Sequence, residues 1–425
     1  MSCNPRHRTA ATEDRVTRRP GAAVLLPFVL LACAAAGPAA AQQWLVTPEV
    51  ELGAQWIDNP RLREDTETNS IAGGLVDAAL AVRRNTETSS FLLRPAVIVY
   101  RYGDDGEDEA TNEDSESYFL DLDTRGQGRR NEWRLRGNYR QQQVFHGETT
   151  PSDFDDLIGD DDQTGTGRTF ERRQRDLWRI QPGYTMEFTE LTSLALDAGY
   201  VDVSYDVQQE NEAVDYNSTR LDAALIRELS PYNQVELGVY GMRYDPEVAE
   251  RGSDSVGGSI RYQQSTSDIS TFFIEVGAQE AQSNSISDPD VEISETSFLW
   301  NIGYVRQLEV TRWRFDLGQD VTPSGTGRLV ERDQYRVAMQ HQLQPRWLLD
   351  LSAVYLATDA VADEGVTSSD RDYAQARGSL GYQLTRSWTV QGLYSLTWQD
   401  FADIPGDAME HEVRLSLIYQ PPLPQ

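Results

Sequence analysis

The sequence predicts an all-β protein, a transmembrane antiparallel β-barrel of about eighteen strands, with sixteen strands as the alternative count. The first observation behind this prediction is that apolar residues stand at alternate positions. Residues 347–357 show this plainly, with Trp347, Leu349, Leu351 and Tyr355 apolar and the intervening positions mixed. A period of two places apolar side chains on one face of a β-strand and polar ones on the other.

The second observation is that aromatic residues stand at the ends of these apolar faces. Residues 388–398 repeat the alternation between Trp388 and Trp398, and residues 413–419 end at Tyr419. The alternative, a secreted β-sandwich or propeller, buries its apolar face against other strands and needs few aromatics at strand ends. Strands of about ten residues with aromatic girdles at both ends are typical of membrane barrels.

The third observation concerns the N-terminus. Residues 1–41 carry five arginines, then an Ala- and Leu-rich run, then small residues ending at Ala41, as in a secretory signal peptide. A lipoprotein site at Cys33 is a weaker alternative. Beyond this leader no apolar run approaches the eighteen or so residues that a membrane helix needs. We therefore expect residues 42–425 to form the barrel, in the outer membrane of a Gram-negative cell.

Each strand is bounded by turn residues and by the loss of alternation. The predicted spans are 45–57, 71–83, 89–101, 115–126, 131–144, 173–188, 192–206, 213–228, 232–245, 254–265, 269–281, 294–307, 311–321, 328–343, 346–358, 371–384, 387–399 and 409–420. Their number is even, as expected for a bacterial single-chain barrel.

The connections between these strands are of two kinds. Those after even-numbered strands are short, such as Glu190-Leu191 and Gln344-Pro345. Most of those after odd-numbered strands are longer, and the stretches 103–115 and 146–170 are rich in acidic residues. Short periplasmic turns that alternate with long, acidic extracellular loops are the expected asymmetry of a membrane barrel.

Tryptophans support the same orientation. Trp133, Trp313, Trp347 and Trp388 each follow a short turn. We expect them to form the inner aromatic belt, because amphipathic rings settle at a membrane interface.

Charge and composition restrict the partners. The formal net charge is −30, and every basic residue of the chain apart from histidine is an arginine. So acidic a chain disfavours nucleic acid as a partner. The expected partners are outer-membrane lipid and lipopolysaccharide, and a polysaccharide is a further candidate. Both cysteines, Cys3 and Cys33, lie in the leader, so no disulfide framework is predicted.

Little in the sequence indicates catalysis or metal binding. The chain beyond the leader has His146, His341 and His411 as its histidines, and it contains no Gly-x-Ser-x-Gly elbow. The acidic run Asp160-Asp161-Asp162 lacks the spacing of an EF-hand loop. We therefore predict no enzyme activity, no metal site and no cofactor.

Four segments resemble the outer-membrane β-barrel porin families of Gram-negative bacteria, especially the group found near exopolysaccharide and exosortase systems. They are Trp56-Ile57-Asp58-Asn59, Arg332-Asp333-Gln334-Tyr335, Leu384-Thr385-Arg386-Ser387-Trp388 and Glu412-Val413-Arg414-Leu415-Ser416-Leu417-Ile418-Tyr419. The resemblance covers the whole mature chain and implies an outer-membrane barrel that acts in passage or export.

If apolar positions face lipid, the alternate positions face the lumen. The candidate solute-binding residues are therefore the arginines in this register: Arg134, Arg136, Arg140, Arg179, Arg314, Arg336, Arg377 and Arg414. Guanidinium groups bind carboxylates and phosphates, and fixed charges select solutes by sign. The alternative is that each arginine braces the wall through an acid such as Asp121, Asp316 or Glu412.

Two classes of function remain open. A pore would pass small polar solutes or export an anionic exopolysaccharide, with the stretch 146–170 either folded inward as a constriction or solvated outside. The alternative class is a structural or adhesive barrel that does not conduct.

Overall fold

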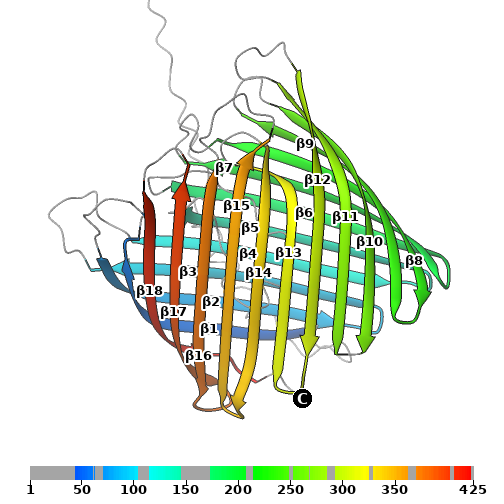
Figure 1. The fold of residues 1–425 in the computed structure, drawn as a ribbon. Coiled ribbons are helices and arrows are strands. Elements are labelled where there is room, and N and C mark those ends of the chain that lie inside the picture. Colours follow the sequence, from blue (N-terminus) through cyan, green and yellow to red (C-terminus); the bar gives the residue numbers. More distant parts are fainter. Residues whose placement is uncertain are drawn as a thin grey trace, which may run out of the picture. The chain divides into compact units, whose positions relative to one another are not determined.

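The computed structural model describes residues 44–60, 62, 70–103, 114–144, 173–206, 214–247, 252–267, 269–284, 292–324, 329–361, 370–402 and 406–422. These residues form one closed antiparallel sheet of eighteen strands (Figure 1). The predicted signal peptide lies outside the described residues. None of the described residues belongs to a helix with the length and apolar content needed to cross a membrane.

The strands follow one another around the barrel in chain order. They are β1 (Trp44–Asp58), β2 (Ser70–Asn85), β3 (Ser89–Tyr102), β4 (Ser115–Gln127), β5 (Asn131–Val144), β6 (Arg173–Thr189), β7 (Thr192–Tyr205), β8 (Tyr216–Ser230), β9 (Asn233–Pro246), β10 (Ser253–Ser267), β11 (Ser270–Asn284), β12 (Glu292–Gln307), β13 (Thr311–Pro323), β14 (Leu329–Gln344), β15 (Trp347–Ala360), β16 (Arg371–Gln383), β17 (Trp388–Phe401) and β18 (Asp407–Tyr419). The predicted count of eighteen is confirmed, and the alternative of sixteen is wrong. No predicted boundary differs from the observed one by more than three residues.

The barrel closes where the first strand meets the last. β1 pairs with β2 on one side and with β18 on the other, and Val50 lies opposite Tyr419 while Asp58 lies opposite His411. Closure leaves no strand with an unpaired edge, so every strand shares its backbone hydrogen bonds with two neighbours.

One end of the barrel, here called the turn end, carries the connections that follow the even-numbered strands. Backbone hydrogen bonds close these turns, for example from Gly128 N to Asn131 O at 2.7 Å and from Leu308 N to Thr311 O at 2.7 Å. The predicted short turns are therefore confirmed. The opposite end, here called the loop end, carries the connections that follow odd-numbered strands. Most of their residues, including the acidic stretches, lie outside the described residues.

The outward face of the barrel is apolar along most of its height. Large apolar side chains at alternate positions are well exposed there, with Leu221 at 61%, Val239 at 62% and Leu415 at 61% of full exposure. The residues between them point inward, because successive side chains of a strand alternate between the two faces. The parity of each residue thus assigns it to the outer or the inner face.

Aromatic side chains lie on the outward face near the turn end. Trp347 packs on Tyr382 with ring centroids 4.7 Å apart, and Trp388 packs on Tyr419 at 4.9 Å. The indole of Trp133 covers Gly126, where an added Cβ would come within 2.5 Å of the ring. A glycine at this position therefore leaves room for the tryptophan of the neighbouring strand.

Candidate functional site

The inner face of the barrel is the candidate functional site, and the eight arginines chosen from the sequence all lie on it. Arg134, Arg136 and Arg140 share one face of β5 because even numbers of residues separate them. Their partners across the sheet include Asp123, which pairs in register with Arg136, and Leu177, which pairs with Arg140. The four tryptophans predicted for the aromatic belt have the opposite parity and lie on the outward face.

Ion pairs with acids of the same wall hold Arg134, Arg136, Arg314 and Arg414 among the eight. Arg134 Nη2 lies 2.8 Å from Asp197 Oδ1, and Arg136 Nε lies 3.5 Å from Asp123 Oδ2. The pairs of the other two join residues of one strand, Arg314 with Asp316 at 3.1 Å and Arg414 with Glu412 at 2.7 Å. These contacts support the bracing role, and they also keep the guanidinium groups in place along the lumen.

The other four arginines lie deeper among neighbouring side chains. Arg179 is 4% exposed and Arg336 is 8% exposed. Arg140 and Arg377 are half-buried on β5 and β16. Each of these four also makes contacts within the protein. The lumen wall is therefore a packed layer of charged groups, in which the arginines have settled positions.

The inner wall also holds arginines that the sequence prediction did not include. Arg94 of β3 binds Glu49 of β1, with Nη2 3.1 Å from Oε2. Arg332 of β14 lies 2.8 Å from Asp320 of β13. Arg371 donates from Nη2 to Gln399 Oε1 at 3.1 Å, and its guanidinium carbon lies 4.8 Å from the ring centre of Tyr373.

A signal for Arg94 exists but is obscured. The strand that carries it reads SSFLLRPAVIVYRY, which is apolar on both faces, so alternation alone does not reveal its inward side. The parity becomes clear only once β3 is paired with β2 and β4. Arg332 has the same parity as Arg336 on β14, and Arg371 has the same parity as Arg377 on β16, so alternation could have identified both.

At the loop end the inner face carries buried apolar side chains as well as Arg175, Arg332 and Arg371. A cluster of buried side chains lies there, here called the mouth cluster. It comprises Leu177, Val203, Tyr205, Tyr216, Met242, Tyr244, Ala281, Val321, Leu329 and Val361. The rings of Tyr216 and Tyr244 meet edge to face at 5.3 Å between centroids. These side chains pack on one another, so the space that they fill inside this end of the barrel excludes water.

The mouth cluster joins strands that are not neighbours in the sheet. Tyr244 of β9 donates a hydrogen bond from its hydroxyl to the carbonyl oxygen of Ser324, just beyond β13, at 2.7 Å. β10, β11 and β12 separate these two strands, so the contact reaches across the inside of the barrel. Ser324, just beyond β13, therefore lies close to β9 on the inside of the barrel. The stretch 146–170, predicted as one possible constriction, lies outside the described residues.

Comparisons with known proteins find similar chains among the solved structures alone. No family model matches the chain, and no curated protein matches its sequence. The barrel is similar to outer membrane protein OpdK from Pseudomonas aeruginosa, with 10% identity and a TM-score of 0.44 over 88% of this chain and 98% of that one. It is also similar to OccAB4 from Acinetobacter baumannii, with 10% identity and a TM-score of 0.43 over 89% and 98%.

A third similar structure is the FrpB iron transporter from Neisseria meningitidis, with 7% identity and a TM-score of 0.44 over 88% of this chain and 81% of that one. Scores of this size carry no argument about function.

The described residues offer no group of three or more histidine, cysteine or carboxylate side chains arranged to hold a metal ion. The two histidines beyond the leader that the structure describes face outward. His341 Nδ1 lies 2.7 Å from the hydroxyl of Thr311, and His411 Nδ1 lies 2.9 Å from the hydroxyl of Tyr394. The inner wall presents fixed charge in its middle, and at the loop end it presents the mouth cluster beside Arg332 and Arg371.

Proposed function

We propose that this chain is an outer-membrane pore that passes small polar solutes, with anions favoured by the arginines of its lumen. The observation that carries the proposal is the contrast between the two faces of one closed sheet. The outward face is apolar and exposed, and the inward face carries Arg134, Arg136, Arg314 and Arg414 beside their acids. A closed sheet with this contrast suits a bilayer, since lipid surrounds it and water fills it.

The size of the barrel supports a conducting path. Barrels of 16 to 18 strands are too wide for side chains alone to fill, and they leave an aqueous channel. The eighteen strands of this barrel place it in that class. Ion pairs along the wall set a transverse field, through which a solute passes according to its charge and dipole.

The placement in the cell belongs to the same proposal. We infer that residues 1–41 are the signal peptide that carries the chain across the inner membrane, and that residues 42–425 insert into the outer membrane. The turn end then faces the periplasm and the loop end faces outward, as in bacterial barrels generally. The ring contacts Trp347–Tyr382 and Trp388–Tyr419 would stand at the periplasmic interface.

A second candidate function is export of an anionic exopolysaccharide, which would use the same arginines. A polymer needs a wider mouth than a small solute does. The hydrogen bond from Tyr244 to Ser324 narrows that mouth, so the described geometry favours small solutes. Deletion of the gene in its host separates the two candidates, because only an exporter is expected to reduce secreted polysaccharide when it is lost.

Single-channel recording tests the pore directly. The purified protein is inserted into a planar bilayer, and both the conductance and the reversal potential under a KCl gradient are measured. We expect stable conductance steps and a reversal potential that indicates a preference for Cl⁻. A folded, heat-modifiable barrel that conducts no current would overturn the pore and favour a structural or adhesive barrel.

A further inference from the structure

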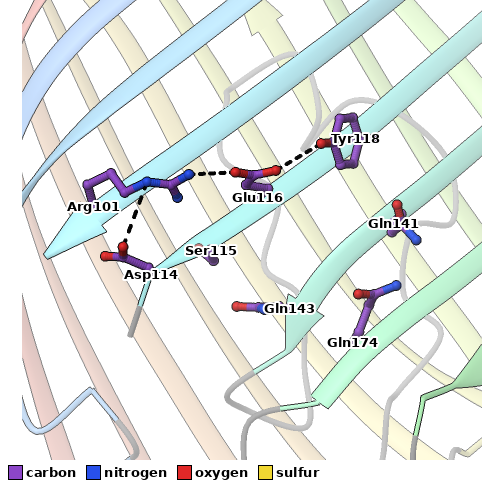
Figure 2. Close-up of a pocket in the computed structure, with 8 residues that line it drawn as sticks. All are labelled: Arg101, Asp114, Ser115, Glu116, Tyr118, Gln141, Gln143 and Gln174. Atoms are coloured by element: carbon purple, nitrogen blue, oxygen red, sulfur yellow. Dashed lines mark hydrogen bonds and ion pairs between the residues drawn. The ribbon is translucent and has the colours of Figure 1, made fainter. Parts of the chain in front are cut away.

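A polar cavity of about 430 Å³ opens on the wall formed by β3 to β6, at the loop end (Figure 2). Its lining residues are Arg101, Asp114, Ser115, Glu116, Tyr118, Gln141, Gln143 and Gln174. This cavity is separate from the arginines of the lumen, which lie on the other face of the same strands.

The register of the strands places most of this lining on the outward face. Tyr139 and Trp178 pair across β5 and β6, and their rings meet at a tilt of 37° with centroids 4.5 Å apart. Trp178 is 50% exposed, so this aromatic pair lies on the outer surface. Gln141 stands two residues beyond Tyr139, and Gln143 and Gln174 form the next outward pair. The three amides therefore lie just past the aromatic pair, toward the loop end.

The charged groups of the cavity are already matched to each other. Arg101 binds Glu116 and also lies 3.7 Å from Asp114, while the hydroxyl of Tyr118 donates to Glu116 at 3.0 Å (Figure 2). One guanidinium held between two carboxylates is a poor site for a phosphate, because the acids repel a further anion. The cavity thus offers no net positive charge to an anionic ligand.

The chemistry that remains is neutral and rich in hydrogen-bonding groups. Gln141, Gln143 and Gln174 line one side, and each amide carries both a donor and an acceptor group. Paired donors and acceptors beside carboxylates and a tyrosine ring match the hydroxyl groups of a sugar. A sugar hydroxyl both donates and accepts, and it carries no charge that the acids would repel.

We propose that this cavity binds the core oligosaccharide of an outer-leaflet lipopolysaccharide, and not the disaccharide that carries its acyl chains. The proposal rests on the outer-membrane placement argued above, but not on conduction through the lumen. In that placement the Tyr139–Trp178 pair stands at the outer interface, and the cavity opens directly above it. The acyl chains would lie against the apolar outer face while the sugars reach the amides.

The experiment counts glycolipids bound to the purified barrel. The protein, expressed from its full-length sequence and extracted from membranes, is stripped of host lipid in detergent. It is then titrated with rough lipopolysaccharide, which carries core sugars, with lipid A, which carries the phosphates and the lipid A disaccharide but no core sugars, and with phosphatidylglycerol. Native mass spectrometry reports the bound species. We expect rough lipopolysaccharide to bind at least fivefold more tightly than lipid A or phosphatidylglycerol.

Variants locate the site. The triple variant Q141A/Q143A/Q174A is expected to lose most of the preference for rough lipopolysaccharide. The control N217A/T219A removes polar groups at outward positions near the loop end of β8, outside the cavity, and is expected to keep the preference. Binding that is equal in the triple variant and the parent, or lipid A binding as tightly as rough lipopolysaccharide, overturns the proposal.

The same preparations are recorded in planar bilayers, so that a failure of the pore is distinguished from a failure of this site. The triple variant should conduct like the parent, because its substitutions lie on the outer face. A silent parent that still binds rough lipopolysaccharide through the three amides would overturn the pore and support the glycolipid site.

Discussion

The middle of the barrel and its loop end follow opposite rules of polarity. In the middle, apolar Leu196 and Leu221 face outward and Asp197 and Asp222 face the lumen. Near the loop end the same strands turn Asp202 outward and Val203 inward, and Val203 is 1% exposed. In the proposed membrane placement, lipid outside and water inside account for the middle. Water outside and a packed interior account for the loop end. The middle of the barrel is thus a charged region that can select solutes by the sign of their charge. The loop end holds an apolar region that limits the size of the solutes.

Opening the apolar region should have the largest effect. The double variant Y216A/Y244A removes the ring contact at 5.3 Å and the hydrogen bond to Ser324, so the end of β13 loses its contact with β9. We expect the single-channel conductance to rise about twofold or more, because the narrowest section of a pore dominates its resistance. The reversal potential of Y216A/Y244A in a KCl gradient should equal that of the parent.

The matched control for this variant is Y200A, which removes a tyrosine from the outer face of β7. It should leave the conductance unchanged. Equal conductance in Y216A/Y244A and the parent would show that the mouth cluster does not limit the current.

Changing the charged region should alter selectivity with little change in conductance. The double variant R134Q/R136Q removes two positive charges whose partners are Asp197 and Asp123. The lumen becomes more negative, so the reversal potential in a KCl gradient should shift by about 10 mV toward K⁺. The variant D121N/D123N should shift it in the opposite direction. Shifts of the same sign in both variants would contradict charge selection in the middle of the barrel.

The smallest expected effect is on the free energy of unfolding. Loss of an ion pair should lower it only where the pair is enclosed by the protein. Arg414 and Glu412 are paired beside the closure seam, with side chains 24% and 11% exposed. We expect R414Q to lower the free energy of unfolding by about 1–3 kcal/mol, because Glu412 loses its charged partner in a sheltered site.

The matched control is R243Q, which breaks the pair of Arg243 with Asp245 on the outer face near the loop end, where the side chains are 68% and 41% exposed. It should cause no measurable change, since exposed pairs contribute little. Urea titration of the barrel in vesicles measures both variants. If R414Q and R243Q lowered the free energy of unfolding equally, enclosure would not determine how much these ion pairs stabilise the barrel.

Much of the fold could be predicted because each strand of the barrel repeats one local rule. Alternation of period two is a property of neighbouring residues, and it assigned Arg134, Arg314 and Arg414 to the inner face without knowledge of their partners. Short turns such as Glu190-Leu191 marked where one strand ends and the next begins. The pairing of β1 with β18, which closes the barrel, agrees with these local signals.

The mouth cluster could not be predicted in the same way. Its key contact joins Tyr244 to Ser324, which are 80 residues apart and lie on strands that are not paired. Near the loop end the polarity of the two faces is reversed, so apolar residues such as Leu177 point inward where the rule would assign them to lipid. The cavity on β3 to β6 was missed for the same reason, because polar outward residues look like an inner face.

The pairing of β1 with β18 also constrains how the molecule can be made. Val50 meets Tyr419 and Asn59 donates to the carbonyl of Met409, a contact that spans 350 positions of the chain. Until β18 has been synthesised, β1 has an unpaired edge that is open to other chains. The growing polypeptide must therefore be kept from aggregating until its last strand emerges, and barrel formation depends on a late, long-range step whose entropy cost slows folding.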